Sequence, residues 1–275
     1  MPRHRVVVPD FRQKKQRGEK IAVLTAYDAT MARLLDGAGV DALLVGDSLG
    51  MVVLGHESTV PVTIDDMVHH TRAVSRGASR ALVVADMPFL TCHAGPADAV
   101  KHAGRLLQEG GAAAVKIEGG TPVVEVVRRL VCAGIPVMGH LGLLPQSVHQ
   151  LGGYGKQATM PADADALLAD ARELERAGAF AIVLEMIPDD LAGVVTAALR
   201  IPTIGIGAGP DCDGQVLVSH DMLGLTSGFV PSFVRQYARL AETVTGAARA
   251  YVDDVRGQRF PASPATIADI PRTTQ

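Results

Sequence analysis

Two short stretches decide the fold: Leu43-Leu44-Val45-Gly46 runs directly into Asp47, and Leu82-Val83-Val84-Ala85 runs directly into Asp86. Uninterrupted aliphatic runs of this length, each followed by a helical pattern, are typical of strands buried on both faces of a parallel sheet. Further runs of this kind end at Lys116 with Glu118, at His140 and at Glu185. If the parallel strands close into a barrel, all these polar residues meet at one mouth.

The whole chain repeats this pattern of a strand followed by a helix. A predicted helix separates each pair of successive strands, and one strand with its helix takes roughly 30 residues on average. Eight such units have the length of a (β/α)8 TIM barrel. The strands are predicted at residues 21–26, 41–46, 81–86, 112–118, 135–140, 180–185, 201–207 and 215–218. We also expect an N-terminal helix, with the basic cluster 12–17 on its solvated face, and a C-terminal helical extension over 233–256. A doubly wound open sheet is the competing architecture.

Composition limits the class of protein. The 275 residues, of which 48% are hydrophobic and 20% charged, fit a single barrel domain over 1–275 with a flexible tail at about 262–275. A formal net charge of −3 gives no electrostatic case for nucleic acid or an anionic membrane as partner. With three widely spaced cysteines and no signal peptide or membrane-spanning stretch, we expect a cytoplasmic protein.

Carboxylates at the strand ends predict a metal site. Asp47 and Asp86 end neighbouring strands, and Glu118 ends the next one. Oxygen ligands without thiolates suit Mg²⁺, which keeps several waters and leaves positions for oxygens of a substrate. The alternative is that both aspartates only cap the helices that follow them.

The other strand-end residues predict acid–base chemistry on an anion. Lys116 and Glu118 are two residues apart and therefore point to the same side of their strand, where Lys116 needs a substrate carboxylate or an ion pair with Glu118. Glu185 ends an apolar strand, so we expect it in a drier place than the metal carboxylates, as suits a general base beside a carbonyl. A glutamate held by a backbone donor is the alternative. His140 orients a substrate or only makes a hydrogen bond in the upper barrel.

Several glycine and histidine motifs are less specific. The run Gly205-Ile206-Gly207-Ala208-Gly209 lacks the spacing of a dinucleotide fingerprint, although its small residues let a ligand approach the backbone. Ser48 adds a hydrogen-bond donor to the loop after Asp47.

The pair His69-His70 lies within a predicted helix and is interpreted as part of one helix face rather than a metal site. The connection from Leu141 to about Pro161 is too long for an ordinary turn and predicts a lid or a disordered loop.

Many longer motifs resemble one family, ketopantoate hydroxymethyltransferase, over roughly residues 20–260. They are Thr25-Ala26-Tyr27-Asp28, Val45-Gly46-Asp47-Ser48-Leu49-Gly50-Met51, Ser58-Thr59-Val60-Pro61-Val62-Thr63, Asp86-Met87-Pro88-Phe89, Val115-Lys116-Ile117-Glu118-Gly119-Gly120, Gly139-His140-Leu141-Gly142-Leu143-Leu144-Pro145-Gln146-Ser147-Val148, Ile201-Pro202-Thr203-Ile204-Gly205-Ile206-Gly207-Ala208-Gly209 and Asp213-Gly214-Gln215-Val216-Leu217-Val218.

The resemblance implies a TIM barrel that transfers a one-carbon unit from 5,10-methylenetetrahydrofolate to 3-methyl-2-oxobutanoate, giving 2-dehydropantoate for pantothenate and coenzyme A. Asp47 and Asp86 would bind Mg²⁺, with Glu118 completing the metal environment. Asp47, Ser48, Asp86 and Lys116 would contact the keto acid. Glu185 would accept the proton in enolate chemistry. The family also implies a homo-oligomer, commonly a decamer.

The sequence departs from the family at its loops, and other functions compete. The lid reads Ser147-Val148-His149 and differs from the family over 149–159, and Cys92-His93 replaces the usual Ser-Tyr. These differences concern lid closure and folate contacts, not the metal and base positions. One alternative is another Mg²⁺–enolate barrel, a lyase or mutase acting on a 2-oxo acid, for which Cys92 is the cysteine nearest a strand end. The other is a barrel without catalytic activity.

Overall fold

The eight strands form a closed, wholly parallel barrel in the order β1 to β8, in a computed structural model that describes residues 4–226, 228 and 230–261. The predicted (β/α)8 fold is confirmed, and the open sheet is wrong. Each strand overlaps its predicted range. The strands are β1 (Ile21–Thr25), β2 (Ala42–Val45), β3 (Leu82–Asp86), β4 (Ala114–Glu118), β5 (Val137–Gly142), β6 (Ala181–Glu185), β7 (Thr203–Ile206) and β8 (Gly214–Leu217).

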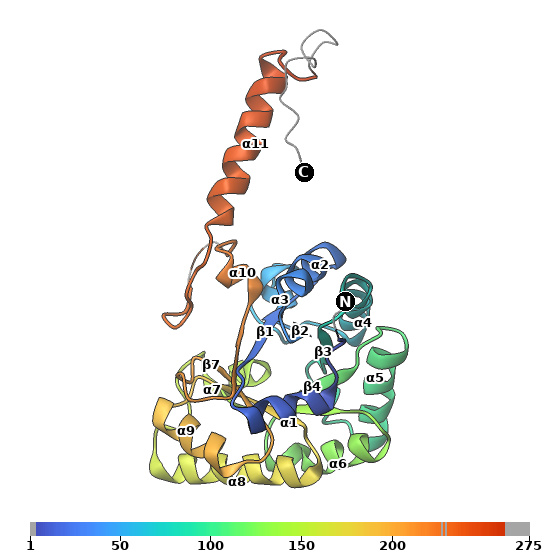
Figure 1. Ribbon diagram of the computed structural model, residues 1–275, viewed down its shortest axis with the longest axis vertical. Coiled ribbons are helices and arrows are strands. Elements are labelled where there is room, and N and C mark those ends of the chain that lie inside the picture. The colour runs from blue at the N-terminus through green and yellow to red at the C-terminus, as the bar shows by residue number, and fades with distance from the viewer. Residues whose placement is uncertain (1–3, 227, 229, 262–275) are drawn as a thin grey trace. The chain divides into compact units, whose positions relative to one another are not determined.

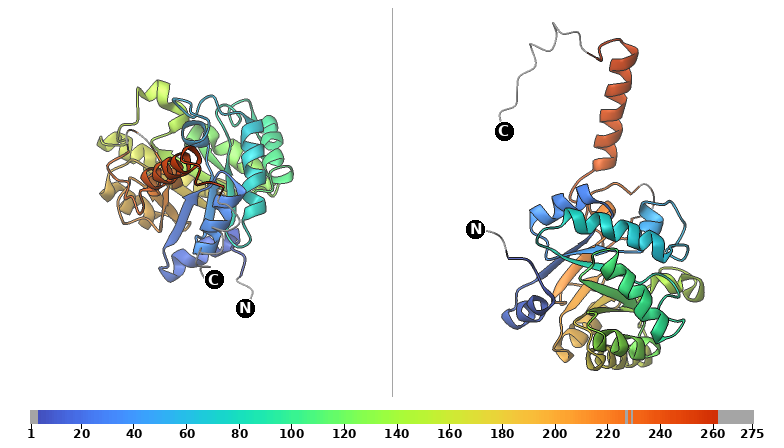
Figure 2. Two further views of the ribbon diagram at one scale, coloured as in Figure 1. Left: turned by 90° about the horizontal axis from the view of Figure 1, so that it is seen from above. Right: turned by 90° about the vertical axis from the view of Figure 1, so that its right-hand side faces the viewer.

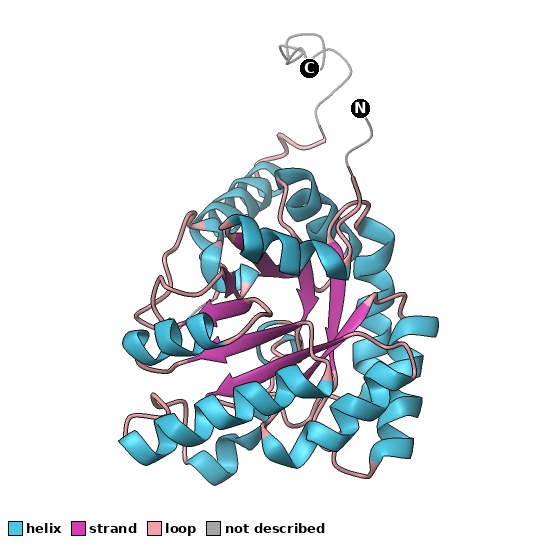
Figure 3. Ribbon diagram, turned by 60° about the horizontal axis from the view of Figure 1, so that its bottom comes forward, coloured by secondary structure: helices cyan, strands magenta, loops and turns pink. Residues whose placement is uncertain are grey.

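Up to the end of β8, helices lie outside the strands, as Figures 1 and 2 show and as the colours of Figure 3 distinguish. They start where the sequence supplies capping groups: Asp28 accepts hydrogen bonds from Thr30 and Met31, and Thr63 forms a capping box with Asp66. Up to the end of β8 the helices are α1 (Val8–Arg17), α2 (Ala29–Ala38), α3 (Leu49–Val52), α4 (Ile64–Gly77), α5 (Pro96–Gln108), η1 (Thr121–Val123), α6 (Val124–Cys132), η2 (Pro145–Ser147), α7 (Val148–Leu151), α8 (Pro161–Ala177) and α9 (Asp189–Ala198).

Alternation along the strands positions the polar residues. Successive side chains of a strand point to opposite faces, so residues two apart share a face. The apolar residues of the barrel interior include Val84 on β3, Ala114 on β4, Met138 on β5 and Val183 on β6. The polar residues that follow them at the same spacing are Asp86, Lys116 with Glu118, His140 and Glu185. The top of the interior is therefore polar, and the rest is a packed aliphatic core.

Helix α1 closes the opposite end of the barrel. Phe11 is fully buried and packs edge-on against Phe180, with ring centroids 5.4 Å apart. Lys14 pairs with Asp41 at 3.0 Å, and Lys15 pairs with Asp213 at 2.8 Å. The prediction that the whole basic cluster 12–17 is a solvated face is therefore wrong for these two lysines, whose charges anchor the helix to the barrel.

The connection after β5 is ordered by short helices. It contains η2 and α7, and Gln157 donates its backbone N–H to the carbonyl of Met186 at 2.7 Å. Gly142, with φ of 94°, ends β5, and a Cβ at this position would collide with the carbonyl oxygen of Glu185. The first residue of the loop therefore packs closely against the end of β6.

The chain divides into two compact units, residues 1–219 and 220–275. The single domain over 1–275 stays a prediction, and the predicted flexible tail 262–275 lies outside the described residues. The boundary falls at the start of α10 (Ser219–Met222), and the second unit contains α11 (Leu240–Arg256), which is shorter than the predicted 233–256. Helix α11 does not extend back to residue 233, and in the segment before it Tyr237 and Leu240 donate their N–H groups to the carbonyls of Met222 and Leu223.

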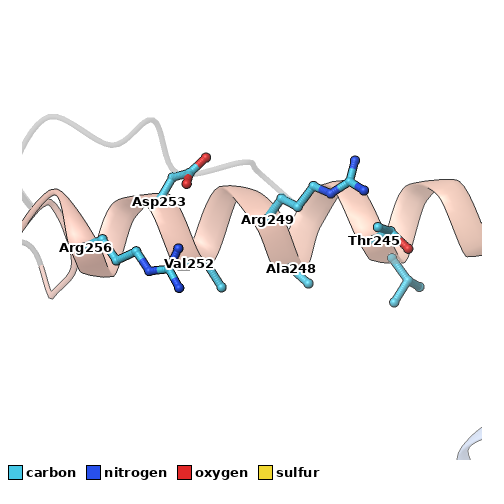
Figure 4. A pocket seen from close by; sticks show the side chains of 7 residues that line it. Thr245, Ala248, Arg249, Val252, Asp253 and Arg256 are labelled. Carbon is cyan, nitrogen blue, oxygen red and sulfur yellow. The ribbon is translucent and has the colours of Figure 1, made fainter.

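Helix α11 is amphipathic and has no buried residue. A hollow on it, shown in Figure 4, is lined from this one helix by Val244, Thr245, Ala248, Arg249, Val252, Asp253 and Arg256. None of the strand-end polar residues lines this hollow. Among the described residues, no helix is both long and apolar enough to cross a membrane.

Candidate active site

Asp86 and Lys116 form the buried ion pair at the centre of the mouth. They are lateral partners in the register of β3 and β4, so their side chains leave the barrel wall side by side. Lys116 Nζ lies 3.2 Å from Asp86 Oδ1 and 3.1 Å from His140 Nδ1. Burial lowers the pKa of Lys116, but the charges of Asp86, Glu118 and Asp47 outweigh it and raise that pKa. The alternative prediction, an ion pair between Lys116 and Glu118, is wrong, because Lys116 pairs with Asp86.

Asp47 lies beside Asp86, just beyond the end of β2. Its backbone N–H donates to Asp86 Oδ2 at 3.0 Å, and its own Oδ2 accepts from Gln146 Nε2 at 2.7 Å. A Cβ at Gly46 would lie 2.8 Å from Ser48 Oγ, so glycine keeps this turn tight. These contacts do not cap the following helices, and that alternative is wrong for both aspartates.

The carboxylates of Asp47 and Asp86 fit a hydrated cation. Burial, then the charges of Asp86 and Glu118, raise the pKa of Asp47 well above its ordinary value, and burial also raises the pKa of Asp86. Asp86 Oδ1 is buried and, despite the nearby Lys116, accepts no hydrogen bond of good geometry. Oxygen atoms in such surroundings gain from a divalent ion, and Mg²⁺ needs only one or two carboxylates besides water and substrate oxygens.

Glu118 has other partners in this arrangement. Its Oε1 lies 3.5 Å from His140 Nδ1, and its Oε2 accepts the backbone N–H of Gln146 at 3.1 Å. Burial raises the pKa of Glu118, but His140, Lys116 and the Gln146 N–H together lower it. Among the described residues, no three His, Cys, Asp or Glu side chains are already placed as ligands of one metal ion. Glu118 as a third contributor to the metal environment stays a prediction.

His140 connects Glu118 to Glu185. Its Nε2 lies 3.0 Å from Glu185 Oε2, and the ring is almost completely buried. Burial and Lys116 lower the pKa of His140, whereas Glu118 and Glu185 raise it, and the net direction is upward. The imidazole therefore lies between two carboxylates, one from each of the strands that flank β5, although neither contact has the geometry of a good hydrogen bond. The sequence does not reveal this arrangement.

Glu185 is less buried than the sequence predicts. Its side chain is 16% exposed, against 4% for Asp86, so the expectation of a drier place than the metal carboxylates is wrong. The chain turns sharply after it, because Met186 adopts a left-handed φ of 49°, an uncommon conformation for a residue other than glycine. The Glu185 carboxylate is thus not sealed from solvent, so a substrate can reach it.

Two residues of the mouth were not predicted as site residues. Tyr27 shares a hydrogen bond of 2.8 Å between its hydroxyl and that of Ser48, and it comes from the end of β1. Gln146 begins the long connection after β5. Both follow the ends of strands, which is the one signal in the sequence that could have indicated them.

Other sequence motifs lie outside this cluster. His69 and His70 are neighbours on α4 with ring centroids 5.2 Å apart, and His70 Nδ1 donates to the carbonyl of Tyr27 at 2.7 Å, as expected for a helix face. All three cysteines are free. Burial raises the pKa of Cys92 to about 12, which makes it a neutral thiol.

Comparisons with known proteins identify the family of this chain. A family model described as ketopantoate hydroxymethyltransferase matches residues 5–263. The chain belongs to the ketopantoate hydroxymethyltransferase family. It is 59% identical over 259 residues to 3-methyl-2-oxobutanoate hydroxymethyltransferase of Moorella thermoacetica, covering 94% of this chain and 96% of that protein. It is 57% identical to the protein of the same name from Syntrophus aciditrophicus, covering 91% and 92%.

Solved structures share the fold of this family member. Phosphonopyruvate hydrolase in complex with oxalate and Mg²⁺ matches with a TM-score of 0.61 and 13% identity, covering 97% of this chain and 92% of that one. A 2,3-dimethylmalate lyase of the phosphoenolpyruvate mutase and isocitrate lyase superfamily matches with a TM-score of 0.59 and 19% identity, covering 94% and 92%. At such identities the likeness concerns the barrel alone and does not favour lyase or mutase activity.

Proposed function

We propose that this chain transfers a hydroxymethyl group from 5,10-methylenetetrahydrofolate to 3-methyl-2-oxobutanoate, giving 2-dehydropantoate in pantothenate biosynthesis. The observation that carries the proposal is the near full-length match to hydroxymethyltransferases, 59% identical for the protein of Moorella thermoacetica. The polar mouth agrees with it, because an anionic keto acid needs a cation and a base in one place.

The substrate carboxylate is assigned to Lys116, as predicted. Its ammonium group is buried and held by Asp86, so it is fixed in place and keeps its charge. Asp47 and Asp86 would hold Mg²⁺, which supplies polarisation of the keto oxygen and stabilises the negative charge that develops there. The Ser48 hydroxyl, oriented by Tyr27, donates to a substrate oxygen.

Glu185 is assigned the proton transfer. It takes the single proton from C3 of the keto acid, and the carbon that loses the proton attacks the methylene carbon carried by folate, so that one C–N bond of the methylene bridge breaks and its nitrogen is protonated. A water molecule then supplies the hydroxyl group and displaces the second folate nitrogen, which releases tetrahydrofolate and 2-dehydropantoate. His140 lies against Glu185 and positions its carboxylate for this transfer. The folate reaches the site from the side where Glu185 is exposed.

Turnover by the purified protein tests the proposal. The protein is incubated with both substrates and Mg²⁺, and 2-dehydropantoate is measured by mass spectrometry. We expect product from the wild type and from Glu173→Gln, which changes an exposed glutamate of α8, and a loss of about 10²–10⁴-fold for Glu185→Gln. Absence of product from the wild type, or cleavage of the keto acid instead, would contradict it.

Three further features stay predictions: a homo-oligomer, commonly a decamer in the family, a cytoplasmic location and a single domain. The first is tested by light scattering on the purified protein. A monomer at micromolar concentration would contradict it.

A further inference from the structure

Gln146 ties together the ends of several strands although it belongs to a loop. It stands in η2, after β5, and its side-chain nitrogen donates to Asp47 Oδ2 at 2.7 Å and to the carbonyl oxygen of Met87 at 3.0 Å. Its backbone N–H donates to Glu118 Oε2 at 3.1 Å. One residue thus contacts the ends of β2, β3 and β4 from across the mouth.

These contacts use the whole donor capacity of the amide. A glutamine side chain has two N–H donors, and here one goes to a carboxylate and the other to a backbone carbonyl that cannot move with it. The nitrogen is therefore fixed, and it fixes Asp47 in turn. A carboxylate that can rotate freely must be ordered when a cation binds, whereas one that is already held needs no such ordering.

We propose that Gln146 is a positioning residue for the cation site, holding the Asp47 carboxylate in the orientation in which it binds the metal ion. The amide uses Oδ2 and thereby leaves Oδ1 as the oxygen for the ion. The inference rests on the proposed function, since it takes Asp47 as a ligand. It also gives the connection after β5 a role in assembling the metal site.

Binding of Mn²⁺ alone, followed by electron paramagnetic resonance of the free ion, tests the inference without substrate. The variant Gln146→Met keeps the size of the side chain and the backbone donor to Glu118 but removes the donors to Asp47 and Met87. We expect Mn²⁺ to bind about tenfold more weakly, as is typical when a partner of a metal ligand is lost. Gln146→Asn, which is too short to reach Asp47, should weaken binding in the same direction.

A matched control lies in the same loop. Gln157 Nε2 donates only locally, to the carbonyl of Gly155 at 2.9 Å, so Gln157→Met should bind Mn²⁺ like the wild type. Activity gives a second readout: Gln146→Met should need about tenfold more Mg²⁺ for half-maximal rate and recover most of its kcat at saturating Mg²⁺. A merely structural role would lower kcat at every Mg²⁺ concentration.

The Mn²⁺-binding results can contradict this inference without contradicting the proposed function, and the reverse. Mn²⁺ affinity within twofold of wild type in both Gln146 variants, with normal thermal unfolding, would overturn the inference even if the wild type makes 2-dehydropantoate. Weaker Mn²⁺ binding in both variants would support it even if the wild type turned over a different keto acid. Wild-type protein that binds no Mn²⁺ would overturn it outright.

Discussion

The imidazole of His140 lies against the carboxylate of Glu185, with Nε2 3.0 Å from Oε2, at the top of the neighbouring strands β5 and β6. The other ring nitrogen faces Glu118 and Lys116. The proposed base therefore lies against a residue that is itself in contact with Lys116. A change at His140 should reach the base directly, and it should reach the cation ligand Asp86 only through Lys116.

We expect His140→Ala to lower kcat by about 10²-fold, because a carboxylate that can swing out of line transfers the proton less often. The KM for 3-methyl-2-oxobutanoate should change much less. Steady-state kinetics measures both. Added imidazole should restore part of the lost kcat, and a variant with wild-type kcat would show that His140 does not position Glu185.

Asp47→Asn should make the metal-free protein more stable. Burial and two neighbouring carboxylates disfavour the charged form of Asp47 and raise its pKa, so removing the charge should add about 0.5–2 kcal/mol to the free energy of unfolding. The measurement is chemical unfolding in the presence of a chelator. Mg²⁺ should stabilise the wild type and not the variant. A variant less stable than the metal-free wild type would contradict this account of the site.

The carboxylate of Asp36 should make the free energy of unfolding decrease as the pH falls into the acid range. Burial raises the pKa of this carboxyl, but hydrogen bonds from Ala81, Ser79 and Arg80 outweigh it and lower the pKa below the ordinary value. A group whose pKa is lowered on folding stabilises the protein above its unfolded pKa, about 4, and loses that effect as pH falls through its folded pKa.

Asp36→Ala should therefore cost about 2–4 kcal/mol at pH 7, since it leaves several donors without their acceptor. The cost should shrink steadily below pH 4. Urea unfolding of both proteins between pH 7 and pH 3 measures the difference. A cost that does not vary with pH would mean that the charge of Asp36 is not what stabilises the loop before β3.

Phe11→Ala should destabilise the protein by about 3–5 kcal/mol, because it empties a fully buried ring site at the closed end of the barrel. The catalytic mouth lies at the other ends of the strands. We therefore expect an unchanged kcat/KM at temperatures where the variant is folded. Thermal unfolding and kinetics on the same sample check both parts, and a large loss of kcat/KM in folded protein would contradict the separation of the two ends.

Much of this architecture could be predicted from the sequence, since it depends on local periodicity. Asp86, Lys116, Glu118, His140 and Glu185 follow apolar strands at fixed spacing, and a closed parallel barrel brings such residues together. What could not be predicted depends on the path of the chain between strands. Gln146 reaches Asp47 only because η2 folds back over the mouth.

The exposure of Glu185 and the ion pairs of Lys14 and Lys15 could not be predicted either, because they depend on segments far away in the sequence. Glu185 ends an apolar strand, yet its exposure is decided by the loops around it rather than by its neighbours in sequence. Lys14 and Lys15 belong to a basic run like any solvated helix face. Their partners Asp41 and Asp213 are far along the chain, and only the placement of α1 under the barrel brings them together.

The central claim is that Glu185 removes the C3 proton of a keto acid held at the cation site, and hydrogen exchange measures this step without folate. In D₂O with Mg²⁺, the account predicts that the wild type replaces the C3 proton of 3-methyl-2-oxobutanoate by deuterium, observed by nuclear magnetic resonance. Glu185→Gln should exchange about 10²–10⁴-fold more slowly, and a chelator should stop exchange by the wild type. Exchange at the wild-type rate in Glu185→Gln, or none in the wild type, would contradict the account.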